Sequence, residues 1–198
     1  MLYPDSLNNA INSFKRLPGI GEKSAERFAL SILDLDEEEI EDFSQSIKTC
    51  KERLHRCKTC GHLTDKEECS ICTDTNRKSN VICVVEDYKS VFMFEKSGTF
   101  QGKYHVLNGL ISPMDGIYPE DININSLVNR IENLGDVEVI VALKPTIEGE
   151  TTTLYIKKIF ENKGIKVSRL SYGIPMGVDI DYLDSITLDR ALSDRIEL

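Results

Sequence analysis

Four cysteines lie within one short segment of the chain, CKTCGHLTDKEECSIC. They form two C-x-x-C pairs, and each pair can direct two thiolates at a single point. Four thiolates are the ligand set of a tetrahedral structural zinc ion, and Gly61 supplies the Cβ-free position that the turn after the first pair favours. The spacing therefore predicts one structural Zn²⁺ ion per chain, held by Cys57, Cys60, Cys69 and Cys72.

Other uses of these cysteines stay open at this point. A pair of disulfides is one alternative, whereas a catalytic zinc is disfavoured because four thiolates leave no position for water. The N-terminal segment MLYPDSLNNAINSF is too polar for a signal peptide, and no apolar run approaches the length of a membrane span. We therefore expect a cytoplasmic protein, where cysteines stay reduced and bind metal. Cys83, in the apolar run VICVV, should be a buried thiol, and Cys50 has no assigned role.

The charge of the chain is unevenly distributed. The net charge of −9 argues weakly against a nucleic-acid partner, but local fields steer a polyanion more strongly than the overall sum does. Residues 34–42 hold seven acids and no base, which is typical of a solvated helix face. A basic stretch follows, and it suits either a solvated helix face or a nucleic-acid surface; its members are Lys48, Lys51, Arg53, Arg56 and Lys58.

The pattern along the 198 residues divides the chain into four regions. Residues 1–55 are expected to be helical, and residues 56–79 form the zinc segment. Residues 80–174 alternate short apolar runs with amphipathic segments, and residues 175–198 form a C-terminal segment expected to contact another subunit. A hydrophobic content of 40% is enough for a packed core.

The region from residue 80 onward has the pattern of an α/β domain. VICVVE (81–86) and VEVIVAL (137–143) are nearly continuous apolar runs, typical of strands buried on both faces, and KVSRLS (166–171) is a weaker candidate. Helices are expected between and after these strands, over residues 87–98, 124–135 and 151–164. The predicted fold class is a multidomain α+β protein with an N-terminal helical region, a small zinc finger, and a C-terminal α/β domain whose mainly parallel sheet carries helices on both faces.

Residues 6–33 predict two helices joined by the tight turn LPGIG. Proline cannot continue the first helix, which should end near Arg16, and Gly19 and Gly21 permit the turn before a second helix that begins near Glu22. Unpaired backbone N–H groups at the start of the second helix, together with its dipole, favour a phosphate.

Four basic residues flank this turn: Lys15, Arg16, Lys23 and Arg27. An ordinary helical hairpin is the alternative, because such turns are common without any ligand. The sequence LPGIGEKSAERFA also resembles the helix–hairpin–helix motif of DNA-binding proteins that ignore base sequence. The four bases, Gly19 and Gly21 are therefore the predicted DNA-binding residues, through phosphate contacts that carry no base information.

Acidic residues are expected near one edge of the parallel sheet. Glu86 ends the first strand, and Glu148 and Glu150 follow the second, so these carboxylates could converge where the strands end. Such a cluster would suit Mg²⁺ and phosphoryl chemistry, although acidic capping of a helix N-terminus explains Glu148 and Glu150 equally simply.

The order VICVVE, strand, EGE resembles the Toprim domain of topoisomerases and bacterial primases. Catalytic Toprim domains carry a D-x-D pair before the EGE-like segment, whereas this chain has Lys144 and Thr146 at those positions. A cation and a hydroxyl cannot replace two carboxylates as Mg²⁺ ligands. The resemblance therefore implies a Toprim scaffold without catalysis, with Glu86, Glu148 and Glu150 as a surface for a protein partner.

Taken together, the hairpin, the four-cysteine segment and the degenerate Toprim domain resemble the RecR family of bacterial recombination mediators over essentially the whole chain. The C-terminal Tyr172-Gly173-Ile174-Pro175 is similar to that family's G-[VI]-P turn, but Lys144 departs from the family's usual Asn. The resemblance implies a non-enzymatic, nucleoid-associated protein that forms a tetrameric ring, binds single- and double-stranded DNA, and acts with RecO and RecF to load recombinase onto gapped DNA. Two alternatives are a small Toprim nuclease or primase-like enzyme and an interaction module without DNA contact.

Overall fold

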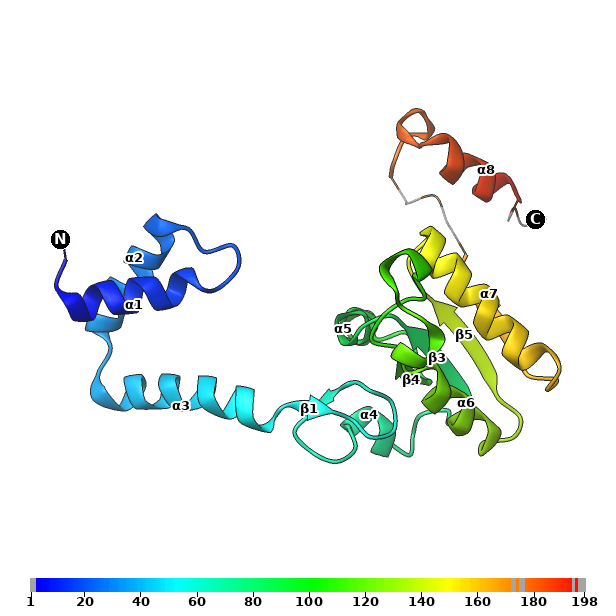
Figure 1. The fold of residues 1–198 in the computed structure, drawn as a ribbon, viewed down its shortest axis with the longest axis horizontal. Helices are drawn as coiled ribbons and strands as arrows, with labels where there is room; N and C mark the ends of the chain where they lie inside the picture. Colours follow the sequence, from blue (N-terminus) through cyan, green and yellow to red (C-terminus); the bar gives the residue numbers. More distant parts are fainter. Residues whose placement is uncertain (1–2, 172–173, 175–176, 194, 196–198) are drawn as a thin grey trace. The chain divides into compact units, whose positions relative to one another are not determined.

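The computed structural model describes residues 3–171, 174, 177–193 and 195 (Figure 1). It forms two compact units, residues 1–54 and residues 55–198, which are treated separately below. None of the described helices is both long enough and apolar enough to cross a membrane. The turn predicted over residues 172–175 lies, apart from Ile174, outside the described residues.

The first unit is helical, as the sequence predicted. Its elements are α1 (Asp5–Lys15), α2 (Glu22–Ser31), the 3₁₀ segment η1 (Ile32–Asp34) and α3 (Glu37–Arg53). Ile11 of α1 packs against Ala25 and Ala29 of α2, and the small alanines let the two helices approach closely. The acidic run begins α3 through a capping box, in which Asp36 accepts from the Glu39 N–H and the Glu39 side chain accepts from the Asp36 N–H. Carboxylates in this first turn complement the helix dipole.

The second unit begins with the zinc segment and continues into the α/β domain. The zinc segment contains two short antiparallel strands, β1 (His55–Arg56) and β2 (Leu63–Thr64), and the single-turn helix α4 (Ser70–Thr73). The α/β domain has a four-stranded parallel sheet in the order β4-β3-β5-β6. Its strands are β3 (Val81–Val85), β4 (Lys103–Val106), β5 (Glu138–Ala142) and β6 (Lys166–Arg169).

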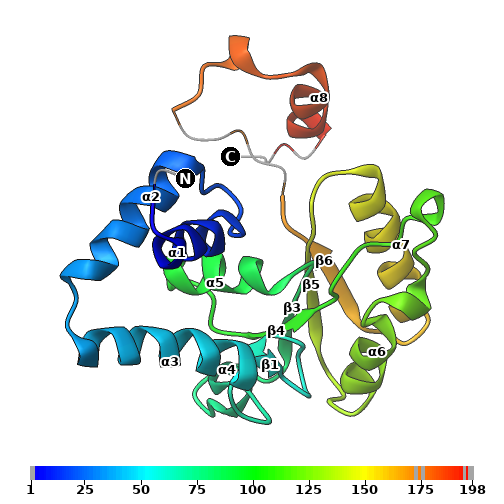
Figure 2. The ribbon, with the colours of Figure 1, turned by 60° about the vertical axis from the view of Figure 1, so that its left-hand side comes forward.

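Helices cover both faces of this sheet, which confirms the predicted fold class. The helices of the domain are α5 (Tyr88–Ser97), α6 (Ile124–Glu132), α7 (Ile147–Glu161) and α8 (Ser185–Ser193), with 3₁₀ segments η2 (Pro113–Asp115), η3 (Pro119–Asp121) and η4 (Ile180–Tyr182). Figure 2 shows α5 on one side of the sheet and α6 and α7 on the other. Alternating residues of the central strand β3 divide between these layers, because successive side chains of a strand point to opposite faces.

The zinc segment shares a core with one of the two faces. Ile82 and Val84 of β3 face the core that α6 and α7 cover. Cys83 and Val85 face the opposite core, where α5 packs together with the clustered cysteines of the zinc segment. Cys83 is buried, as predicted, and burial raises its thiol pKa to about 12. The zinc segment is thus part of the packing of the sheet.

Strand β4 was not predicted from the sequence. Its four residues, KYHV, include a lysine and a histidine, so they lack the apolar continuity of β3 and β5. His105 is nevertheless fully buried, with its Nε2 2.9 Å from the carbonyl oxygen of Asn123 and its pKa lowered to about 4, chiefly by burial. A neutral imidazole with this partner is compatible with a core position, which composition alone does not reveal.

Candidate metal centre and nucleic-acid surface

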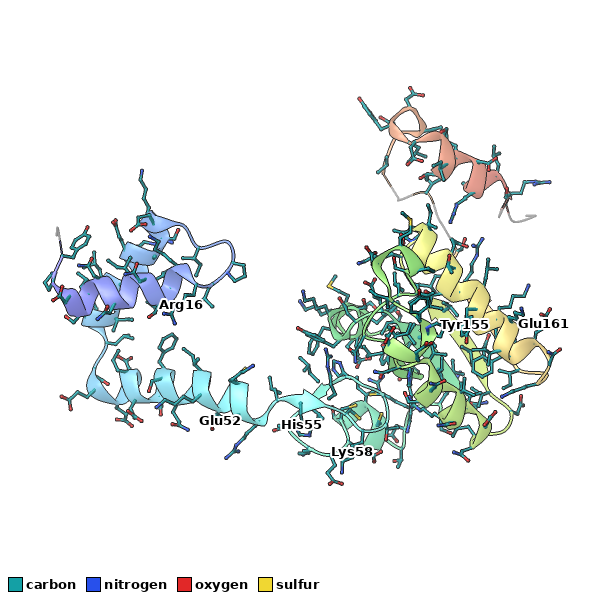
Figure 3. The ribbon with its side chains drawn as sticks, viewed as in Figure 1. Arg16, Glu52, His55, Lys58, Tyr155 and Glu161 are labelled. Atoms are coloured by element: carbon teal, nitrogen blue, oxygen red, sulfur yellow. The ribbon has the colours of Figure 1, made fainter. Side chains whose placement is uncertain are left out.

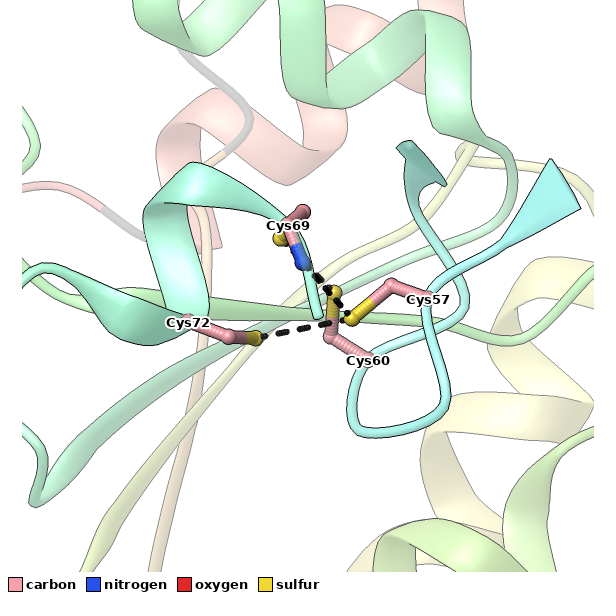
Figure 4. A group of neighbouring side chains, drawn as sticks. All are labelled: Cys57, Cys60, Cys69 and Cys72. Carbon is pink, nitrogen blue, oxygen red and sulfur yellow. Dashed lines mark hydrogen bonds between the residues drawn. The ribbon is translucent and has the colours of Figure 1, made fainter. Parts of the chain in front are cut away.

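The four cysteines of the zinc segment converge on one point (Figure 4). Their sulfur atoms all lie within 4.8 Å of one another, with 3.6 Å between the Sγ atoms of Cys60 and Cys69 and 4.0 Å between those of Cys57 and Cys72. A tetrahedral zinc site with Zn–S bonds of about 2.3 Å has sulfur–sulfur edges of about 3.8 Å. A disulfide needs about 2.05 Å, so the geometry fits a metal site and contradicts the disulfide alternative.

The surroundings of the sulfurs also fit a bound cation. The backbone N–H of Cys69 points at the Sγ of Cys57 at 3.3 Å, and such N–H groups stabilise metal-bound thiolates. Hydrogen bonds to Cys69 and Cys72 and then burial raise the pKa of Cys60. Four thiolates side by side need a divalent cation to offset their charge, and they leave that cation no open position for substrate. The four cysteines would therefore hold a structural ion.

Hydrogen bonds to cysteine carbonyls join the metal cluster to β4. The N–H of Val106 donates to the carbonyl of Cys60 at 2.7 Å, and the ammonium of Lys103 donates to the carbonyl of Cys72 at 2.7 Å. Gly61 adopts a φ of +75°, and a Cβ there would lie 3.0 Å from the carbonyl oxygen of Val106. Only glycine combines this left-handed backbone with such close packing against the strand.

The predicted hairpin turn joins α1 and α2 in the first unit. Gly19 adopts a φ of +83°, and Gly21 is the N-cap of α2 without a side chain that could accept from the first N–H groups. These N–H groups and the helix dipole make the start of α2 suitable for an anion. Arg16, labelled in Figure 3, follows directly after α1 at the beginning of the turn.

The basic residues around the turn differ in their pairing. Lys15 forms an ion pair with Glu22, so part of its charge is compensated. Arg16, Lys23 and Arg27 are exposed and form no ion pair within the described part of the chain. The guanidinium of Arg27 lies 5.4 Å from the centre of the Phe28 ring, which restricts its position on α2.

The three acids of the α/β domain do not form a metal cluster. Among the described residues, the only group of three or more metal-binding side chains is that of the four cysteines. Glu86 is paired with Lys144 at 3.0 Å, so an ammonium group occupies the position beside this carboxylate. Glu150 is paired with Arg169 at 3.3 Å and with Arg190 of α8 at 3.1 Å. Glu148 lines a surface cavity of about 590 Å³ that Arg190 also borders.

Sequence reasoning missed the two arginine partners of Glu150. Arg169 lies on β6 and Arg190 on α8, so their separation along the chain hides the contact. The start of α7, which carries Glu150, is formed by a local contact: the Thr146 side chain caps the helix by accepting from the Gly149 N–H at 3.2 Å. The residue at a position that would be a ligand in a catalytic Toprim domain therefore has a structural use here.

Comparisons with known proteins cover nearly the whole chain. The matching family models describe the RecR helix-hairpin-helix over residues 7–51, the RecR zinc finger domain with four cysteines over 54–74, the Toprim domain over 80–171 and the RecR C-terminal region over 173–196. A curated relative from Natranaerobius thermophilus, named Recombination protein RecR, is 46% identical over 196 residues, which cover 99% of this chain and 98% of the relative. Because the chain is 46% identical to this relative over nearly its full length, and because RecR family models match it from the hairpin to the C-terminal region, the chain belongs to the RecR family.

Proposed function

We propose that this chain binds DNA in recombinational repair through the turn between α1 and α2, and does not act chemically on it. The observation that carries the proposal is the uncapped start of α2 beside three exposed cations, Arg16, Lys23 and Arg27. Backbone N–H groups and mobile cations contact phosphates irrespective of the bases. Lys15, Gly19 and Gly21 complete the proposed surface, and the recombination protein to which the chain is similar supports its biological setting.

We propose that the protein is not catalytic because Glu86 and Glu150 are paired with basic side chains. A Mg²⁺ ion at Glu86 would have to displace the ammonium of Lys144, and Thr146 is engaged in capping α7. Glu150 already meets two guanidinium groups, whose charge opposes the binding of a third cation. The site therefore lacks the oxygen ligands that hold a divalent metal beside a phosphoryl group.

A test of this proposal exposes DNA to the protein with Mg²⁺ or Mn²⁺. The zinc-loaded chain should bind oligonucleotides of unrelated sequence with similar affinity, and supercoiled plasmid, single-stranded DNA and primed templates should be recovered unchanged. Electrophoresis of the recovered DNA is the measurement. Nicking, relaxation or primer synthesis that disappears in a Glu86→Gln variant would show that the carboxylate is catalytic and contradict the proposal.

We further propose that the metal is zinc, at one ion per chain, and that the protein assembles into a tetrameric ring able to encircle DNA. The resemblance to recombination mediators also supports RecO and RecF as partners in loading recombinase, with Glu86, Glu148 and Glu150 contributing a contact surface. The assembly is tested by the native mass in solution, with and without DNA. A particle of a single 22.4 kDa chain under both conditions would contradict the ring.

A further inference from the structure

A second basic site lies in the α/β unit, separate from the hairpin. A cavity of about 270 Å³ opens between the zinc segment, β4 and the end of α6. Two cations line it, together with Cys72 of the metal cluster and neutral side chains, and none of the lining residues carries a carboxylate; these residues are Thr59, Cys72, Ser79, Lys103, Arg130, Asn133 and Leu134. An anion entering the cavity would therefore meet positive charge without a competing carboxylate in its wall.

Both cations are held in place by backbone carbonyls. The ammonium of Lys103 donates to the Cys72 carbonyl at 2.7 Å, and the guanidinium of Arg130 donates to the Tyr104 carbonyl at 2.6 Å. Each bond uses one donor of a group that has three in lysine and five in arginine. Neither cation forms an ion pair with a carboxylate in the portion of the chain that the structure describes. Both are partly buried, so solvent screens their charges less than it screens those of fully exposed side chains.

The remaining wall suits a ligand larger than a single carboxylate. The Ser79 side chain adds a hydroxyl, and Leu134 offers an apolar surface. The amide nitrogen of Asn133 donates one of its two hydrogens to the Asn129 carbonyl at 2.8 Å, which leaves its second N–H as a donor. Phosphate presents several acceptor oxygens at once, and a fixed guanidinium beside an ammonium and a hydroxyl matches that arrangement.

We propose that this cavity binds a phosphate group, supplied either by a nucleic-acid backbone or by free phosphate. The site is independent of the proposed hairpin contact because it lies in the other compact unit. A competing explanation is that Lys103 and Arg130 only offset the negative charge that four thiolates keep around a divalent ion. In that case their removal would affect the metal centre and not phosphate binding.

The test uses the zinc-loaded full chain titrated separately with inorganic phosphate and with a single-stranded oligonucleotide. Backbone amide NMR shifts of residues 79, 103 and 130 report on the cavity, and calorimetry gives the affinity. A Lys103→Gln/Arg130→Gln variant should bind the recognised ligand roughly tenfold more weakly or worse, since two charge-assisted hydrogen bonds are lost. Lys157→Gln/Lys158→Gln on exposed positions of α7 makes the same change in charge and should bind like the wild type.

The two titrations separate the possible sources. Weakened binding of inorganic phosphate identifies a free-phosphate site, and weakened binding of the oligonucleotide alone identifies a backbone contact. A Lys23→Ala/Arg27→Ala variant should leave the shifts that inorganic phosphate induces at the cavity unchanged, so a failure of the hairpin proposal is distinguishable from a failure here. No shift at the cavity with either ligand, or equal weakening of binding in the Lys157→Gln/Lys158→Gln control, would overturn the proposal.

A milder variant covers the case in which the double replacement disturbs the fold. Ser79→Asp places a carboxylate in the cavity wall while both cations and their backbone contacts stay. It should weaken phosphate binding, with zinc content and unfolding temperature unchanged. Unchanged phosphate binding in Ser79→Asp, combined with zinc loss in the double variant, would assign the two cations to the metal centre and overturn the proposal.

Discussion

Replacing Cys60 with serine should release the metal and unfold the zinc segment. A hydroxyl is a poor ligand at a site built for four soft thiolates, and zinc contributes on the order of 10 kcal/mol to the folding of small zinc-finger peptides. The effect should extend into the sheet, because the carbonyl of Cys60 accepts from Val106 of β4. The measurements are elemental analysis of the purified protein and its thermal unfolding curve.

Cys50→Ser provides the matched control for this experiment. Cys50 lies exposed on α3, outside the metal cluster, so the same chemical change there should leave zinc content and stability unchanged. Two results would refute the account of the centre. One is a wild-type protein that carries no zinc, and the other is a Cys60→Ser protein that keeps a full equivalent of zinc with normal stability.

Replacing Gly149 with alanine should destabilise the α/β domain by roughly 1–3 kcal/mol or more, the range for overpacked sites. Gly149 is buried in the first turn of α7, and a Cβ there would overlap the carbonyl oxygen of Lys144 far inside van der Waals contact. Neither backbone segment can move aside cheaply. The turn that carries Lys144 should shift, which would also disturb its ion pair with Glu86. Denaturant unfolding measures the change in the free energy of unfolding.

Gly21→Ala is the control for a glycine that has space around it. A Cβ at Gly21 meets nothing within 4 Å, and its φ of −84° is accessible to alanine. The variant should therefore lose no more than about 1 kcal/mol, the cost of replacing a glycine N-cap by alanine. Equal stability of Gly149→Ala and wild type would mean that the backbone at Lys144 can move aside without cost.

The sequence was most informative where local chemistry determines the structure. Cysteine spacing predicted the metal cluster, and the prolyl-glycyl turn predicted the boundary between α1 and α2, because proline and glycine restrict the backbone in any context. The apolar runs predicted β3 and β5, because a short continuous apolar run is typical of a strand that is buried on both faces. Each of these features depends on residues that are neighbours in the chain.

Features that depend on distant residues could not be predicted in this way. Strand β4 is recognisable only once β3 offers it a partner and Asn123, the residue before α6, offers a carbonyl to His105. The pairing of Glu150 with Arg169 and Arg190 arises from tertiary folding, so the sequence placed three acids near an edge without revealing their cations. The docking of the zinc segment onto β4 was hidden for the same reason.

The salt dependence of DNA affinity in a Lys23→Ala/Arg27→Ala variant tests the central claim most directly. These residues lie four positions apart on α2, so both can approach one phosphate backbone. The variant should bind every sequence more weakly, and the slope of log affinity against log salt should flatten by roughly two units, one for each lost phosphate contact. Lys157→Ala/Lys158→Ala should retain the wild-type slope, and zinc content and native mass should be equal in all three proteins. Equal affinity and slope for the wild type and the Lys23/Arg27 variant at several salt concentrations would contradict DNA binding through the hairpin.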